Sequence, residues 1–158
     1  MKKLLAIIMV FISLFLCSCS KESKFGVQQF VERMNNTFMT DYTTSEFMKS
    51  EKDGDNFLFL TRGSNMLNLL LDDDNNIKGI SLLLTADGNI ENTENLYCQM
   101  CSVFTGNDYE TQCKIFSDSD FLNESIKFAD GNSIITVGRY KYTIVSNSYA
   151  ITFFCDKI

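Results

Sequence analysis

Apolar residues in the first half of the chain follow two different spacings. Over Lys24 to Phe38 they recur three or four positions apart, which indicates an amphipathic helix with one buried face. Over Phe47 to Leu84 they form short runs, broken by turn-forming residues at 53–54, 62–65 and 72–76, which indicates an antiparallel meander of about four strands. One face of this meander is expected to carry Leu67, Leu69, Leu71, Ile80, Leu82 and Leu84.

The second half again places helical spacing before alternating spacing. A helix is predicted over Thr93–Thr105, ended by Gly106, and a shorter helix over Asp108–Phe116. Further strands are predicted at residues 126–128, 133–137, 139–145 and 149–155, with a turn at Asn147-Ser148 before the last of them. The expected fold is α+β: an antiparallel sheet of about seven to eight strands, with the N-terminal helix and the two central helices packed on it.

Length and composition suit one folded domain. The chain has 158 residues, 45% of them hydrophobic and 13% aromatic, which is enough for a single hydrophobic core and unlike a disordered protein. We expect this domain to span residues 24–158.

The first twenty residues resemble the export signal of bacterial lipoproteins. Met1-Lys2-Lys3 precedes an apolar run from Leu4 to Leu16, which has the length of a secretory signal and is short for a permanent membrane span. The stretch Leu16-Cys17-Ser18-Cys19 resembles the lipobox, with an apolar residue three positions before the modified cysteine and a small residue just before it. The alternative, Cys17, would place bulky Leu16 next to the cleaved bond.

This resemblance implies a signal peptide over residues 1–18, a lipid on Cys19 and a short tether over residues 19–23. Without residues 1–18 the chain keeps 12 basic and 20 acidic residues, a net charge of −8. Such a surface repels nucleic acid and anionic headgroups, so we expect no nucleic-acid partner and attachment to the membrane through acyl chains alone. The implied location is extracytoplasmic, on the cell membrane or the outer membrane.

Four cysteines follow the lipobox: Cys98, Cys101, Cys113 and Cys155. An even number in an exported protein allows two disulfides. However, Cys101, Cys113 and Cys155 fall on apolar faces of their predicted elements, which favours buried free thiols; a single disulfide is also open. Cys98 lies on the polar side of its predicted helix, so it is the candidate reactive thiol.

Other chemistry has little support in the sequence. Cys98-Gln99-Met100-Cys101 is a C-x-x-C motif, but it lies inside a predicted helix, and the chain has no proline to form the cis-proline loop of a thioredoxin-like redox site. Residues 72–76 are rich in Asp and Asn but lack the glycine and the final glutamate of a calcium loop. With no histidine in the chain, we expect neither a metal site nor a cofactor.

The absence of familiar catalytic motifs directs the functional prediction. The chain has no nucleophile elbow, no H-E-x-x-H motif and no glycine-rich phosphate loop. We therefore expect a membrane-tethered extracytoplasmic lipoprotein that acts as a non-enzymatic binding module for a protein, a peptide or an envelope component. The alternatives are a small hydrolase based on paired carboxylates, a thiol-redox accessory factor, or an exported inhibitor or immunity-type protein.

Overall fold

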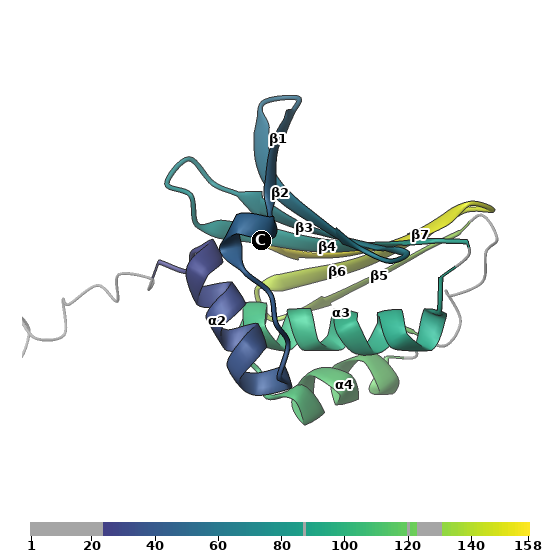
Figure 1. The fold of residues 1–158 in the computed structure, drawn as a ribbon. Helices are drawn as coiled ribbons and strands as arrows, with labels where there is room; N and C mark the ends of the chain where they lie inside the picture. Colours follow the sequence, from purple (N-terminus) through teal and green to yellow (C-terminus); the bar gives the residue numbers. More distant parts are fainter. Residues whose placement is uncertain (1–23, 87, 120, 123–130) are drawn as a thin grey trace, which may run out of the picture.

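The computed structural model describes residues 24–86, 88–119, 121–122 and 131–158. These residues form a sheet with helices on one side of it (Figure 1). In chain order the elements are α2 (Val27–Phe38), a 3-10 turn η1 (Thr44–Glu46), β1 (Met48–Lys52), β2 (Asp55–Arg62), β3 (Asn65–Leu71), β4 (Ile77–Thr85), α3 (Ile90–Thr105), α4 (Tyr109–Asp118), β5 (Gly131–Val137), β6 (Tyr140–Ser146) and β7 (Ala150–Lys157).

The described strands form one antiparallel sheet in the order β1-β2-β3-β4-β7-β6-β5. The first four strands are a meander in chain order, as predicted. The last three join it in reverse order, so β7 pairs with β4 at the centre and β5 lies at the edge. The α+β prediction is confirmed; the strand predicted at 126–128 lies outside the described residues.

Alternation along the strands decides which side chains meet the helices. The predicted inward face of β3 and β4 is confirmed, because these six side chains are buried: Leu67, Leu69, Leu71, Ile80, Leu82 and Leu84. The inward positions of β6 and β7 are also buried, among them Tyr142, Ile144, Ile151, Phe153 and Cys155. Their neighbours along each strand lie on the other face of the sheet.

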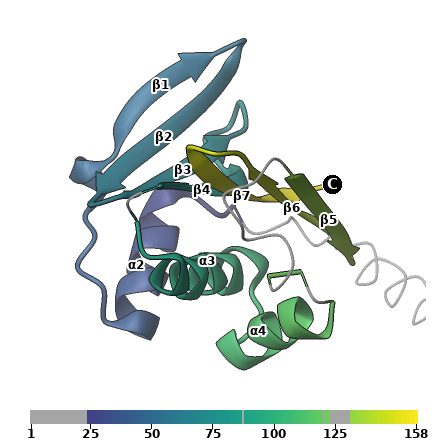
Figure 2. The same cartoon turned by 90° about the vertical axis from the view of Figure 1, so that its right-hand side faces the viewer.

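Helices α2, α3 and α4 all cover the same face of the sheet (Figures 1 and 2). Helix α3 contacts α2, α4 and β4, so it is covered on several sides. It begins after Asn89, whose side chain accepts a hydrogen bond from the backbone N–H of Asn92, and it ends at Gly106 in the left-handed conformation. This start lies three residues before the predicted one.

Tyr97 joins α3 to both of its neighbouring layers. Its ring stacks on Phe116 of α4 with ring centres 5.4 Å apart, and it contacts Phe153 of β7 at 5.0 Å. Its hydroxyl donates a 2.6 Å hydrogen bond to the backbone carbonyl of Phe154. The fully buried tyrosine hydroxyl therefore has a hydrogen-bond partner.

Among the described helices, none is both long and apolar enough to span a bilayer.

Candidate functional site

The face of the sheet opposite the helices is apolar across its centre. Side chains on this face alternate with the buried ones, and six apolar residues there are only half-buried: Phe57, Phe59, Met66, Leu70, Leu83 and Phe154. Figures 1 and 2 show that the β1–β2 hairpin rises away from the helices, so no described helix covers this side. We call it the open face. Apolar surface that the fold leaves uncovered marks a candidate binding site.

A groove of about 340 Å³ crosses the open face over β2, β3, β4 and β7. It is lined by Phe57, Asn68, Leu70, Gly79, Ile80, Ser81, Thr152, Phe154 and Asp156. The register explains this set, because residues opposite each other in antiparallel strands share a face. One row across the strands runs Phe57, Leu70, Gly79, Asp156, and the next runs Phe59, Asn68, Ser81, Phe154. The volume lies at the lower end of the range for small-ligand pockets.

Small residues on β4 make the floor of the groove. Gly79 has no side chain, and a Cβ added there would lie 2.6 Å from the Oδ1 of Asp156. The carboxylate of Asp156 therefore leans over Gly79. Next to it, the Asn68 side-chain amide donates a 3.0 Å hydrogen bond to the hydroxyl of Ser81. The groove thus combines Phe walls with a polar floor and one carboxylate.

The electrostatics of the groove centre on Asp156. Partial burial raises the pKa of this carboxyl above its usual value, and the positive charge of Lys141 on β6 lowers it in part. Lys141 is the cross-strand neighbour of Asp156. Among the described residues that line the groove, Asp156 is the one acidic side chain. This arrangement suits an apolar ligand that carries a hydrogen-bond donor or a positive charge.

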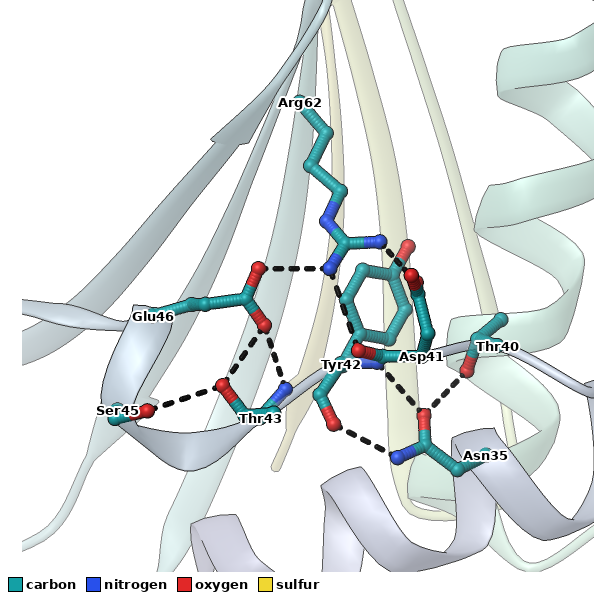
Figure 3. Close-up of polar contacts among 8 residues, drawn as sticks. All are labelled: Asn35, Thr40, Asp41, Tyr42, Thr43, Ser45, Glu46 and Arg62. Carbon is teal, nitrogen blue, oxygen red and sulfur yellow. Dashed lines mark hydrogen bonds and ion pairs between the residues drawn. The ribbon is translucent and has the colours of Figure 1, made fainter.

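A second polar cluster surrounds Arg62 at the end of β2 (Figure 3). The Arg62 guanidinium donates to the carboxylate of Asp41 and, at 2.8 Å, to that of Glu46, and it stacks over the ring of Tyr42 at 4.4 Å. These contacts raise the pKa of Arg62 and lower the pKa values of Asp41 and Glu46. Thr43 also donates to Glu46 through its backbone N–H and its hydroxyl.

The segment between α2 and β1 is held by this cluster. The side-chain oxygen of Asn35 on α2 accepts hydrogen bonds from Thr40 and from the backbone N–H of Tyr42, while its amide donates to the carbonyl of Tyr42 at 2.7 Å. Figure 3 shows that the polar groups point toward one another. We interpret the Arg62 cluster as structural, because its two carboxylates are already paired with the guanidinium.

A smaller hollow of about 180 Å³ lies at one end of the molecule. Its lining includes three basic side chains, Arg33, Arg139 and Lys157. Arg33 stacks over Phe25 at 4.9 Å and Arg139 over Tyr140 at 5.5 Å. These aromatic contacts give two of the three cations a role in packing, so this hollow is a weaker candidate than the groove.

The prediction that Cys98 is the solvent-reachable thiol is wrong. Cys98 is only 4% exposed, whereas Cys113 is the partly exposed cysteine. The prediction treated α3 as a helix with one buried side, but α4 packs against its other side. Burial and the neighbouring Cys113 raise the pKa of the Cys98 thiol, which disfavours the reactive thiolate. Cys101 and Cys155 are buried as predicted.

The C-x-x-C motif lies in the middle of α3, and the pKa of Cys101 is also raised by its burial. Thiol-redox sites need the opposite shift. The predicted lipidation site, Cys19, lies outside the described residues. No group of three or more potential metal ligands is found among the residues that the structure describes.

Sequence reasoning missed the groove, although a signal was present. Strands β2 and β3 carry large apolar residues on both faces, for example Leu58 beside Phe57 and Leu69 beside Leu70. A sheet covered on one side needs apolar residues on that side only. Apolar residues on the second face therefore point to a ligand or a partner.

Comparison with known proteins finds no relative: no family model, no curated protein and no solved structure matches the chain.

Proposed function

We propose that this chain is a membrane-tethered, extracytoplasmic lipoprotein and that its domain binds an envelope partner through the open-face groove. The observation that carries the proposal is the gathering of Phe57, Leu70 and Phe154 around a hollow on the uncovered face of the sheet. Leaving such residues in water is unfavourable unless a partner covers them. The lipobox-like sequence at residues 16–19 supports the location.

The chemistry of the groove favours an apolar segment of a protein or peptide as the partner. Two phenylalanine rings offer contact surface without large loss of side-chain freedom, and Asn68 with Ser81 offers polar groups for orientation. Asp156 adds a negative charge that suits a basic or hydrogen-bond-donating group on the ligand.

Carboxylate-based hydrolysis has less support. That chemistry uses two carboxyl groups on either side of the bond to be cleaved. The described lining of the groove provides only Asp156. Asp41 and Glu46 do converge, but on the guanidinium of Arg62, which would have to be displaced before either acted on a substrate.

Site-specific cross-linking in the native envelope tests the proposal. A photoreactive phenylalanine analogue placed at Phe154 should yield a discrete adduct with one partner, because this side chain lies on the groove wall. The same analogue at Tyr149, which is 82% exposed in a turn, serves as the control and should yield none. Equal adducts from both positions, or an adduct from the control alone, would contradict the proposal.

A matched pair of charge substitutions gives a second readout. Leu70→Asp places an acid in the groove, while Val145→Asp places the same acid on the open face, outside the groove lining and at a 42% exposed position. We expect Leu70→Asp to abolish the Phe154 adduct and Val145→Asp to retain most of it. Circular dichroism of both variants checks that the domain is folded.

A further inference from the structure

The end of the molecule where the described chain begins carries a group of basic side chains. Phe25 lies there beside the start of β4, and its carbonyl accepts a 2.8 Å hydrogen bond from the backbone N–H of Ile77. The hollow of about 180 Å³ described above adjoins a second one of about 130 Å³, which shares Phe25, Ile77 and Lys157 with it. We call the two hollows together the basic end. Their basic side chains are Lys24, Arg33, Lys78, Arg139 and Lys157.

The charge of the basic end is opposite to that of the whole molecule. Lys78 forms a 2.8 Å ion pair with Asp55, which lies outside the two hollows, so its charge is balanced. The described linings then hold four basic side chains and one acidic one, Asp72, a charge of +3, whereas the chain after residue 18 has a net charge of −8. The carboxylate of Asp72 is held in its own turn, where it accepts hydrogen bonds from Asn76. The basic end therefore favours anions that the rest of the surface repels.

Aromatic rings hold the two arginines of the basic end in place. The guanidinium of Arg33 lies 4.9 Å from the ring centre of Phe25, and that of Arg139 lies 5.5 Å from that of Tyr140. Phe104 connects these two rings, with its ring centre 6.4 Å from Phe25 and 5.6 Å from Tyr140. Stacking uses the flat face of a guanidinium, whereas its N–H donors lie in the plane of the group. The arginines can therefore pack on the rings and bind an anion at the same time.

The predicted tether brings the basic end close to the membrane. Lys24 follows Cys19 by five residues, and an extended chain of that length spans at most about 18 Å. With a lipid on Cys19, the first described residues stay within this distance of the lipid headgroups. At physiological salt, charges more than about 8 Å from a surface are largely screened. The near end of the molecule therefore decides how an anchored domain interacts with the headgroups, and its net charge does not.

We infer that the basic end binds the phosphate groups of anionic phospholipids in the membrane that holds the acyl chains, and that this contact orients the anchored domain. The inference rests on the proposed lipid anchor. The net charge of −8 keeps an unanchored domain away from such a membrane, so the basic end does not attach the protein by itself. It acts after the acyl chains have brought the domain to the surface.

Photo-cross-linking to lipids tests this orientation. The full lipidated chain is extracted with detergent and reconstituted into vesicles of phosphatidylcholine alone or of equal parts phosphatidylcholine and phosphatidylglycerol. A photoreactive phenylalanine analogue replaces Ile158, which is 68% exposed and follows Lys157, or Tyr149, which is 82% exposed and precedes β7 at its other end. We expect lipid adducts at position 158 mainly in the vesicles with phosphatidylglycerol, and few at position 149 in either. Equal yields at position 158 in both kinds of vesicle would overturn the inference.

Matched charge variants show whether the basic end is responsible. Lys24→Gln with Lys157→Gln removes two of its cations and leaves the stacked arginines in place. In the mixed vesicles this change should lower the adduct at position 158 on the order of tenfold, given the contribution of each basic residue near an anionic surface. Lys49→Gln with Lys114→Gln changes the net charge equally at two exposed positions outside both hollows, and it should lower the adduct less than about twofold.

Circular dichroism checks that both double variants are folded. The readout is the ratio of adduct between the two kinds of vesicle, which a purely structural role of these lysines would leave unchanged. Equal losses in the two variants would assign the effect to net charge and would overturn the inference.

A second arm separates this inference from the proposed anchor. Mass spectrometry of the N-terminal peptide shows whether Cys19 is acylated. In the second arm, a hexahistidine tag before Met1 and a nickel-chelating lipid hold the full chain to the same vesicles, so that tethering does not need acylation. If Cys19 is not acylated, the proposed anchor fails and this arm decides: adducts at position 158 that need phosphatidylglycerol support the inference, and adducts that do not need it overturn it. If Cys19 is acylated and the adducts do not depend on phosphatidylglycerol, the inference fails and the anchor stands.

Discussion

At the scale of single residues, the groove contains one partly buried carboxylate, that of Asp156. Burial raises the folded-state pKa of Asp156 above its ordinary value, so its ionised form is less stable in the folded protein than in the unfolded one. The free energy of unfolding therefore falls as the pH rises through this pKa. We expect Asp156→Asn to raise the free energy of unfolding at pH 7 by less than about 1 kcal/mol, because the group is half-exposed and Lys141 offsets part of the cost.

Urea unfolding at pH 3 and pH 7 checks this prediction. The difference between Asp156→Asn and the unchanged protein should vanish near pH 3, where the carboxyl is protonated in both states. Asp72→Asn is the control with the opposite sign, because hydrogen bonds from Asn76 lower the pKa of Asp72. It should lower stability at pH 7, and this effect should shrink as the pH falls toward the lowered pKa of Asp72. A loss of stability at pH 7 in Asp156→Asn would contradict the account.

Exposure of single residues was only partly predictable from spacing. The buried leucines of β3 and β4 were predicted correctly, because one side of each strand meets the helices. Cys98 was not, because a helical wheel cannot show that a second helix covers the polar-looking side of the first. Spacing describes one element at a time, and the burial of Cys98 depends on α4.

At the scale of elements, one hydroxyl links the central helix to the central strand. Tyr97→Phe removes the 2.6 Å hydrogen bond to the Phe154 carbonyl in a fully buried position. We expect it to lower the free energy of unfolding by about 1 to 2 kcal/mol. Tyr149→Phe, at an exposed position, is the control and should change it by less than about 0.5 kcal/mol. Urea unfolding monitored by circular dichroism measures both; equal effects would contradict the role of Tyr97.

Most elements were predictable from local patterns because their signals are local. The turns at residues 53–54, 62–65 and 72–76 separate the first four strands as expected, since glycine, Asn and Asp there supply the required backbone conformations. Four of the turn residues have positive φ values: Asp53, Gly54, Gly63 and Asn75. The exact start of α3 at Ile90 was missed because its cap, Asn89, precedes the apolar spacing.

At the scale of the whole molecule, the order of the strands was beyond local patterns. The pairing of β7 with β4 joins residues about 70 positions apart, and no spacing within either strand specifies that partner. This pairing also creates the groove, because Gly79 and Ser81 of β4 meet Asp156 and Phe154 of β7 across it. The candidate site could therefore not be located before the topology was known.

At the same scale, the proposed attachment of the molecule to a membrane gives the last prediction. After residue 18 the chain has a net charge of −8, so its surface should be repelled by anionic lipids and cannot replace a lost lipid anchor. Each buried methylene of an acyl chain contributes about 0.8 kcal/mol to membrane binding. Cys19→Ser should therefore move the protein from the detergent phase to the aqueous phase, while Cys17→Ser should leave it in the detergent phase. Mass spectrometry of the N-terminal peptide should find acyl chains on Cys19 in the unchanged protein and in Cys17→Ser. If Cys17→Ser is the variant that becomes soluble, the lipid is carried by Cys17 and the tether is two residues longer.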